Sequence, residues 1–207
     1  MKVIDMDSWP RKDHFALFHS MELPQFNLSF HLDATHFLSY VREQGISFYY
    51  AMCFAATQTA NEMESFRYRI RKDQVILHDR VHPSFTVLQP GEDLFKIVTM
   101  DMGDDLIAFA KEAAERVESQ TDFIQAQAEQ RDDLIYITCI PWVSFTQITH
   151  PAALNRDDSI PRISWGKYFQ QDGKVLLPFS VQVNHSLMDG SHAGRYAEKL
   201  QCYMDQL

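Results

Sequence analysis

The segment Val183–Gly190 holds the residue types best suited to acid–base chemistry in this chain. Its sequence, VNHSLMDG, places His185 after a β-branched run, and Asp189 and Gly190 follow at an H-x-x-x-D-G spacing. Histidine has an unperturbed pKa near neutrality, so a neutral imidazole here can remove a proton from an attacking hydroxyl. From the pattern alone a structural interpretation is equally open: Asp189 caps a helix, Gly190 forms a tight turn and His185 has no chemical role.

Other reactive residue types form weaker patterns. His78 and His82 flank Asp79 as in a metal cluster, but no third ligand lies near them in sequence, so we expect no metal site. His192 is expected to be exposed, just inside a final helix. Three widely separated cysteines in apolar surroundings are expected to be buried free thiols, which is typical of a reducing cytoplasm: Cys53, Cys139 and Cys202.

Further motifs occur in the order found in one group of enzymes. They are, from the N-terminus, Ser8–Phe15, Phe48–Tyr49, Phe66–Arg69, Val81–Pro83, Phe85–Val87, Pro141–Phe145, Gly166–Tyr168 and Lys174–Val183. With the H-x-x-x-D-G segment they resemble the acyl-CoA-dependent acyltransferases, which include chloramphenicol acetyltransferases and the catalytic domains of dihydrolipoyl acyltransferases. The resemblance to the chloramphenicol acetyltransferase family covers Trp9 to about Gln201.

The resemblance implies direct transfer of an acetyl group from acetyl-CoA to a hydroxyl of chloramphenicol, and hence antibiotic resistance. His185 corresponds to the family's general base, and direct transfer requires no Ser or Cys nucleophile. Asp189 corresponds to a structural carboxylate in a buried ion pair with an arginine near the N-terminus, here Arg11. We expect the Arg11 guanidinium to hold Asp189 bidentately and to fix the turn that bears His185.

The group that stabilises the oxyanion is the main departure from the family pattern. The family places a serine hydroxyl six residues after the proline of Pro-Trp-Val, and this position is Gln147 here. A glutamine amide can donate a hydrogen bond, but it is longer than serine and can crowd the site. In a regular strand Ser144 and Thr146 would point to the other face, so neither is expected to replace the serine. Ser164 corresponds to a family threonine that assists the same intermediate through water.

The resemblance also implies where the two substrates bind. Lys167 and Tyr168 correspond to family positions near coenzyme A. On that side, however, a family lysine and a family proline are replaced by Ser47 and Tyr50. Three residues fall where the family lines its antibiotic pocket, although burial statistics alone make each a core residue: Phe18, Pro24 and Phe26.

Several helices and strands must position these residues. Apolar spacing predicts helices over Asp33–Gln44, Ser47–Met63, Asp104–Ser119 and Ser191–Met204. β-Branched and aromatic runs predict strands over Gln74–His78, Phe85–Leu88, Leu134–Ile140, Trp142–Ile148, Arg162–Gln170 and Val175–Asn184. Turns are expected at Pro90-Gly91 and at Gln171–Lys174. With the resemblance, these elements predict an α+β two-layer sandwich of helices on a large mixed sheet, as a single domain over residues 1–207.

Composition restricts the partners of this chain. It has 207 residues, 45% of them hydrophobic, with a formal net charge of -9 and no basic stripe, so we expect one core and no nucleic-acid partner. Met1–Asp7 lacks the apolar run of a signal peptide and no segment is apolar enough for a membrane span, so we expect a cytoplasmic protein without a membrane partner. The resemblance implies a homotrimer with active sites at its subunit interfaces.

Other functions remain open at this point. An acyltransferase with a different hydroxyl or amine acceptor is favoured by three departures from the family: Gln147, Ser47 and Tyr50. A catalytically silent binding protein is disfavoured, because it would have no need to keep His185 together with Asp189 and Arg11. A dihydrolipoyl acyltransferase is disfavoured because no lipoyl domain or linker precedes the fold.

Overall fold

The computed structural model describes residues 1–89, 91–126, 128–151 and 154–207. A seven-stranded sheet in the order β2-β10-β8-β7-β5-β6, with β9 paired to β10, forms its centre. The strands are β2 (Gln25–Asp33), β5 (His82–Val87), β6 (Lys96–Thr99), β7 (Leu134–Ile140), β8 (Arg162–Gly166), β9 (Phe169–Gln171) and β10 (Lys174–Asn184). The pairs β5–β7 and β7–β8 are parallel, and the remaining pairs are antiparallel. The expected α+β architecture with a large mixed sheet is therefore confirmed.

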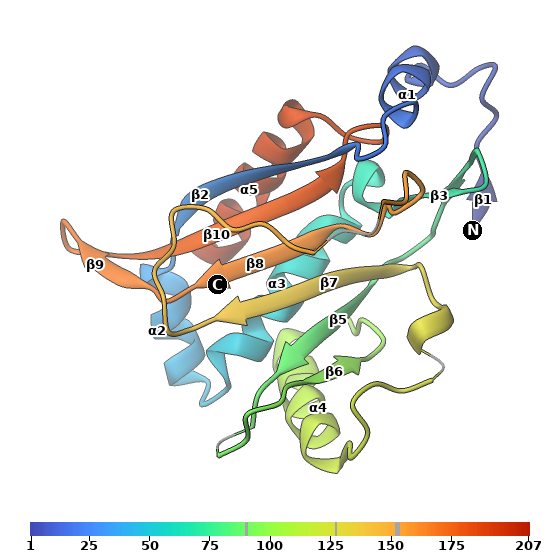
Figure 1. Ribbon diagram of the computed structural model, residues 1–207. Helices are drawn as coiled ribbons and strands as arrows, with labels where there is room; N and C mark the ends of the chain where they lie inside the picture. Colours follow the sequence, from blue (N-terminus) through green and yellow to red (C-terminus); the bar gives the residue numbers. More distant parts are fainter. Residues whose placement is uncertain (90, 127, 152–153) are drawn as a thin grey trace.

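Helices cover one face of this sheet, whereas the segment between β7 and β8 crosses the opposite face (Figure 1). The α-helices are α1 (Lys12–His19), α2 (Thr35–Glu43), α3 (Phe48–Asn61), α4 (Leu106–Ser119) and α5 (Gly190–Asp205). Two 3₁₀ turns, η1 (Glu64–Arg67) and η2 (Ala128–Gln130), connect other elements. A second, three-stranded sheet consists of β1 (Lys2–Val3), β4 (Gln74–Leu77) and β3 (Tyr68–Arg71).

The long strand β10 is buried on both faces from Leu177 onward, with a different chemistry on each. Side chains alternate along a strand, so residues two apart share a face. The residues that belong to the helix-covered core are apolar and at most 2% exposed: Phe179, Val181 and Val183. The alternate residues are polar and at most 6% exposed: Ser180, Gln182 and Asn184. A polar and buried row needs hydrogen-bond partners, which the segment between β7 and β8 and the neighbouring strand β2 supply.

The turn between β9 and β10 forms as the sequence predicts. Asp172 and Gly173 have φ angles of 51° and 78°, and Gln171 pairs with Lys174. Positive φ at both central residues is the requirement of a type I′ hairpin, for which Asp-Gly is a preferred dipeptide. The hairpin sets the start of β10, whose far end carries the candidate base.

Most predicted elements are present, with two exceptions. The strand predicted over Arg162–Gln170 is broken after Gly166 and forms β8 and the short β9. The segment Trp142–Ile148, predicted as a strand, is an irregular loop. Its β-branched and aromatic residues do not pair with a neighbouring strand, because side chains rather than a ladder fix it to the sheet. The residues of α1 and β2 were not assigned to any element from the sequence, and the turn predicted at Pro90-Gly91 begins at a residue outside the described ranges.

The structure also tests expectations about cysteines and histidines. All three cysteines are free, but only Cys53 is buried, while Cys139 is half-buried and Cys202 is exposed. The expectation of three buried thiols is therefore wrong for Cys202. Within the described ranges, no three His, Cys, Asp or Glu side chains are grouped so that they could hold a metal ion. None of the helices that the structure describes is long and apolar enough to cross a membrane.

Candidate active site

The turn between β10 and α5 positions His185. β10 ends at Asn184 and α5 begins at Gly190, so His185 is the first residue after the strand. Its backbone N–H donates to the carbonyl oxygen of Pro24, at 2.7 Å. Asn184 holds the start of the turn through its side-chain oxygen, which accepts from the Ser186 backbone N–H at 2.9 Å. The backbone around His185 is thus fixed on both sides.

Two aromatic rings enclose the imidazole of His185. Phe18 stacks on it with a centroid separation of 3.7 Å and an interplanar angle of 6°, and Phe26 lies 4.7 Å away at 49°. The Nδ1 atom is buried and has no hydrogen-bond partner among the described residues. The three residues expected to line a substrate pocket, Phe18, Pro24 and Phe26, therefore all contact His185 in the same chain.

Arg11 binds this turn through three acceptors. Its Nη2 donates to the His185 carbonyl oxygen at 2.9 Å, its Nε to the Ser186 carbonyl oxygen at 3.0 Å and its Nη1 to Asp189 Oδ2 at 3.0 Å. The expected bidentate grip on Asp189 is wrong, because two of the three contacts go to backbone carbonyls. The pair is also less buried than expected, with side chains 14% and 34% exposed. Arg11 nonetheless joins α1 to the backbone of His185 itself.

Asp189 is the N-cap of α5. Its Oδ1 accepts from the backbone N–H of Ser191 at 3.2 Å and from the Ser191 hydroxyl at 2.7 Å, and it lies 2.8 Å from His192 Nδ1. Burial alone would raise the pKa of Asp189, but the hydrogen bonds from Ser191, Arg11 and His192 outweigh it and hold that pKa well below its usual range. His192 is half-buried, with its Nδ1 also 3.2 Å from the Asp189 backbone nitrogen, so its expected exposure is wrong.

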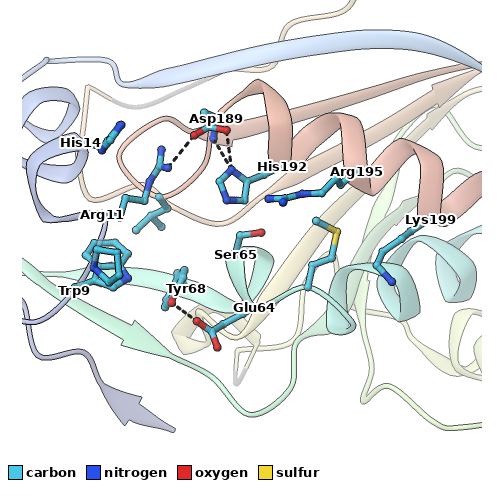
Figure 2. Close-up of a pocket in the computed structure, with 13 residues that line it drawn as sticks. Trp9, Arg11, His14, Glu64, Ser65, Tyr68, Asp189, His192, Arg195 and Lys199 are labelled. Atoms are coloured by element: carbon cyan, nitrogen blue, oxygen red, sulfur yellow. Dashed lines mark hydrogen bonds and ion pairs between the residues drawn. The ribbon is translucent and has the colours of Figure 1, made fainter.

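A hollow of about 670 Å³ lies on the Arg11–Asp189 side of the turn (Figure 2). Figure 2 shows Arg11 pointing toward Asp189, with Trp9 and Tyr68 below and Arg195 extending from α5. His185 is not among the residues that line this hollow. The hollow is therefore distinct from the Phe18–Phe26 environment of the imidazole.

A second group of candidate residues lies under the segment between β7 and β8. Ser164 is fully buried, and its hydroxyl is 2.8 Å from Nε2 of His150. Gln147 is exposed on the same loop. Because residues 142–148 are not a strand, the alternation argument against Ser144 and Thr146 is wrong, and both are exposed.

Polar side chains of the sheet anchor this loop. The Asn27 amide donates to the Ile148 carbonyl oxygen, and the Ser180 hydroxyl donates to Asn27 Oδ1 at 2.6 Å. The His150 backbone N–H donates to Gln182 Oε1 at 3.3 Å. These contacts give the irregular loop a defined position on the sheet. They thereby also fix the position of Gln147 on that loop.

His185 and Ser164 do not come together within one chain. Phe26, which contacts the imidazole, pairs with Val183, whereas Ser164 pairs with Ser180. Val183 and Ser180 are an odd number of residues apart on β10, so the two groups face opposite sides of the sheet. Five residues of strand from Ser180 to His185 also span about 16 Å. The candidate catalytic residues therefore form two separate clusters in each chain.

The candidate coenzyme A residues follow β8. The Lys167 backbone N–H donates to the Val143 carbonyl oxygen at 2.8 Å, and Tyr168 is 41% exposed with its ring 6.0 Å from that of Phe48. Ser47 is the N-cap residue of α3, without a side-chain capping bond, and Tyr50 packs on Tyr49 and Phe85. Lys167, Tyr168 and Ser47 therefore gather near one place, where β8 ends and α3 begins.

His150 is a residue of this region that the sequence analysis did not single out. It has no spaced partner in the sequence, and its contact with Ser164 bridges two segments that only the fold brings together. Burial lowers the pKa of His150, and the nearby Arg162 guanidinium lowers it further.

Comparisons of the sequence with known proteins all point to one family. Residues 1–201 match the family described as chloramphenicol acetyltransferase. A relative named "Chloramphenicol acetyltransferase 2" from Escherichia coli is 32% identical over 206 residues, covering 99% of this chain and 97% of that protein. "Chloramphenicol acetyltransferase" from Klebsiella sp is 30% identical over 207 residues, with 98% and 93% covered.

Solved structures show the fold shared with this chain. A structure named "chloramphenicol acetyltransferase" superposes with a TM-score of 0.91 at 24% identity, covering 98% of this chain and 99% of that one. A probable dihydrolipoamide acetyltransferase from Listeria monocytogenes has a TM-score of 0.69 at 15% identity, with 100% and 95% covered. At these identities the superpositions establish common architecture only.

Proposed function

The chain belongs to the chloramphenicol acetyltransferase family and is an acyltransferase, and we propose that it transfers the acetyl group of acetyl-CoA to a hydroxyl of chloramphenicol. Acetylation of the antibiotic would make the protein a resistance enzyme. The observation that carries the proposal is the His185 turn, which Arg11, Asp189 and two aromatic rings hold in place at the end of β10.

We propose that His185 is the general base of a direct transfer. Nδ1 is buried, so Nε2 is the ring nitrogen left to face an acceptor hydroxyl. Nε2 takes the hydroxyl proton as the oxygen attacks the thioester carbonyl carbon. The tetrahedral intermediate then expels the thiolate by cleavage of the C–S bond, and His185 returns the proton to the coenzyme A sulfur. Atoms and charges balance without an acyl-enzyme.

Arg11 and Asp189 act as positioning residues in this proposal. Arg11 donates to the carbonyl oxygen of His185, and Asp189 connects the same arginine to the start of α5. An imidazole held this way keeps its place while a proton moves on and off it. Phe18, Pro24 and Phe26, which contact His185, would form the wall against which the chloramphenicol hydroxyl is presented.

The active site is proposed to lie between copies of this chain in a homotrimer. Each chain, a single domain over residues 1–207, would supply His185 to one site and Gln147 and Ser164 to the next. Support comes from their location on opposite faces of the sheet, since one chain alone does not bring base and oxyanion groups together. Lys167 and Tyr168 would bind acetyl-CoA at the end of β8, the strand that carries Ser164. Closed symmetry places identical sites at each interface.

An acyltransferase with another acceptor is the second candidate. The exposed Gln147 in place of serine, together with Ser47 and Tyr50, departs from the family at positions near the oxyanion and coenzyme A. Acetyl-CoA as the acyl donor is common to both candidates, and both place the enzyme in the cytoplasm, where its free thiols stay reduced.

The proposed function is tested by thiol release from acetyl-CoA in the presence of chloramphenicol, with mass spectrometry of the drug. We expect rapid release and an acetylated drug with the wild-type protein. His185→Ala should remove the activity while the chain stays folded, and His14→Ala, at an exposed histidine of α1, should leave it unchanged. Full activity of His185→Ala would overturn the assignment of the base, and wild-type release only with other alcohols or amines would favour the second candidate.

A further inference from the structure

His150 presents an imidazole nitrogen on the face of the sheet opposite to the helices. Its Nε2 lies 2.8 Å from the Ser164 hydroxyl, and its backbone is held by Gln182. Nδ1 has no hydrogen-bond partner among the described residues, and it is not one of the buried side-chain atoms without a partner. The ring therefore directs one nitrogen into the protein and leaves the other accessible.

The buried contact determines which nitrogen carries the proton. Ser164 is fully buried, and among the described residues His150 Nε2 is the one side-chain partner of its hydroxyl. The hydroxyl proton has no other hydrogen-bond partner among the described residues, so we infer that Ser164 donates it to Nε2. A neutral imidazole that accepts at Nε2 carries its hydrogen on Nδ1. The accessible nitrogen of His150 is thus an N–H donor.

The surroundings of His150 favour the neutral form of the ring. Its neighbours Ser164 of β8 and Gln182 of β10 are uncharged. The charged groups nearby are Arg162 and Asp158, which form an ion pair with each other, with 2.7 Å between Arg162 Nη2 and Asp158 Oδ2. Burial and then Arg162 lower the pKa of His150. At neutral pH the ring is therefore uncharged, and its tautomer is set by Ser164.

We propose that His150 Nδ1–H donates a hydrogen bond to the oxyanion of the tetrahedral intermediate, in the active site shared with the neighbouring copy. This inference rests on the proposed function and names a further residue for it. His150 follows Gln147 by three residues on the same anchored loop, and Gln147 is the position where the family pattern has its serine hydroxyl. Ser164, which is buried under the ring, acts as the positioning residue that selects the tautomer.

Kinetics of matched variants test the inference. The amide nitrogen of asparagine occupies the position of Nδ1, whereas that of glutamine occupies the position of Nε2. His150→Asn should therefore keep kcat within about tenfold of wild type, while His150→Leu and His150→Gln should lower kcat about a hundredfold with little change in KM for either substrate. Ser164→Ala added to His150→Leu should cause no further loss, because serine acts through the ring.

The outcomes separate the inference from the proposed function. No acetyl transfer by the wild-type protein overturns the proposed function and the inference with it. An active wild type whose His150→Leu variant keeps its kcat overturns the inference alone. In protein labelled with ¹⁵N-histidine, the His150 signals, identified by their loss in His150→Leu, should show a protonated Nδ1, and a protonated Nε2 would contradict the proposed donor.

Discussion

At the scale of single residues, Arg11 determines the position of the candidate base. Its three donors reach two backbone carbonyls and one carboxylate, so they fix a peptide segment rather than a single side chain. A guanidinium can serve three acceptors in fixed directions, which a lysine ammonium on a flexible stem does not reproduce. The charge of Arg11 is therefore less important than its shape.

Arg11→Lys tests this view of the turn. The substitution keeps the positive charge beside Asp189 but loses the contacts to the carbonyl oxygens of His185 and Ser186. A shift of about 1 Å at the base is expected to lower kcat roughly a hundredfold. Lys12→Met, at the exposed neighbouring position, is the control and should change neither kcat nor the melting temperature. Wild-type kcat in Arg11→Lys would show that charge alone suffices.

At the scale of elements, the close approach of β8 to the loop after β7 sets the position of the loop. A Cβ atom on Gly166 would lie 2.6 Å from the Val143 carbonyl oxygen and 2.9 Å from Phe145 Cδ1. Glycine is required there because the backbone of the loop takes the space of a side chain. The loop carries Gln147 and His150, so this contact connects a packing constraint to the site.

Gly166→Ala is expected to displace the loop. Overpacking of this kind costs about 1–3 kcal/mol of unfolding free energy, and we expect kcat to fall by more than that loss of stability explains. Gly194→Ala in α5, where a Cβ meets nothing within 4 Å, is the control and should raise stability by about 0.5–1 kcal/mol. The test is to measure the free energy of unfolding in urea and kcat for both variants. A wild-type kcat in Gly166→Ala would refute the expected displacement of the loop.

Elements with a clear apolar period were predictable from the sequence, and those held by polar contacts were not. The helices α2 to α5 and the strands β7 and β10 follow their periodic patterns. The strand β2 also alternates apolar residues from Phe26 to Leu32, a signal that could have identified it. The residues 142–148 have high β propensity, but that propensity measures fit to a paired, half-buried surface, and here Asn27 and Gln182 hold the loop unpaired.

The candidate site was predictable to a similar extent. Arg11, Asp189 and the two aromatic residues that the motif and the resemblance single out do lie around His185 in the structure. The three-acceptor geometry of Arg11 and the partnership of Ser164 with His150 depend on the path of the backbone, which residue spacing does not encode. Both became visible only once the elements were assembled.

At the scale of the whole molecule, carboxylates held in their ionised form couple stability to pH. For Asp132, burial favours the neutral acid, but hydrogen bonds from Arg71 and His78 outweigh burial and hold the pKa well below its usual range. The pKa of Asp189 is likewise held below its usual range, because its hydrogen bonds outweigh its burial. A depressed pKa in the folded state means that the unfolded chain binds protons first as the pH falls. These groups therefore stabilise the fold above about pH 4, the pKa range of an unfolded aspartate, and the stabilisation is lost in acid.

Acid unfolding tests this coupling. The free energy of unfolding from urea titrations should fall modestly from pH 7 to 5, because burial lowers the pKa of His150 in the folded chain, and should fall steeply from pH 4 to 3. Asp132→Asn should begin from a lower value and show a shallower fall, because one of the linked protons is removed. A stability that does not change between pH 5 and 3 would contradict the assignment of depressed pKa values.

In the proposed assembly, His185 of one chain and the polar sheet face of the neighbouring chain form one active site. Gln147 is exposed within the chain, so Gln147→Trp should fold and should block the neighbour's site. His185→Ala removes the base from its own chain. Each variant alone is therefore expected to be inactive, although each retains one intact half of a site.

Acetyl transfer by mixed oligomers tests this claim most directly. Co-expression of differently tagged His185→Ala and Gln147→Trp chains, followed by sequential affinity purification, yields oligomers that contain both. We predict that about a third of the sites recover, because every mixed trimer has one interface of three that pairs a wild-type His185 with a wild-type face. Mixed oligomers as inactive as their parents would contradict the shared active site.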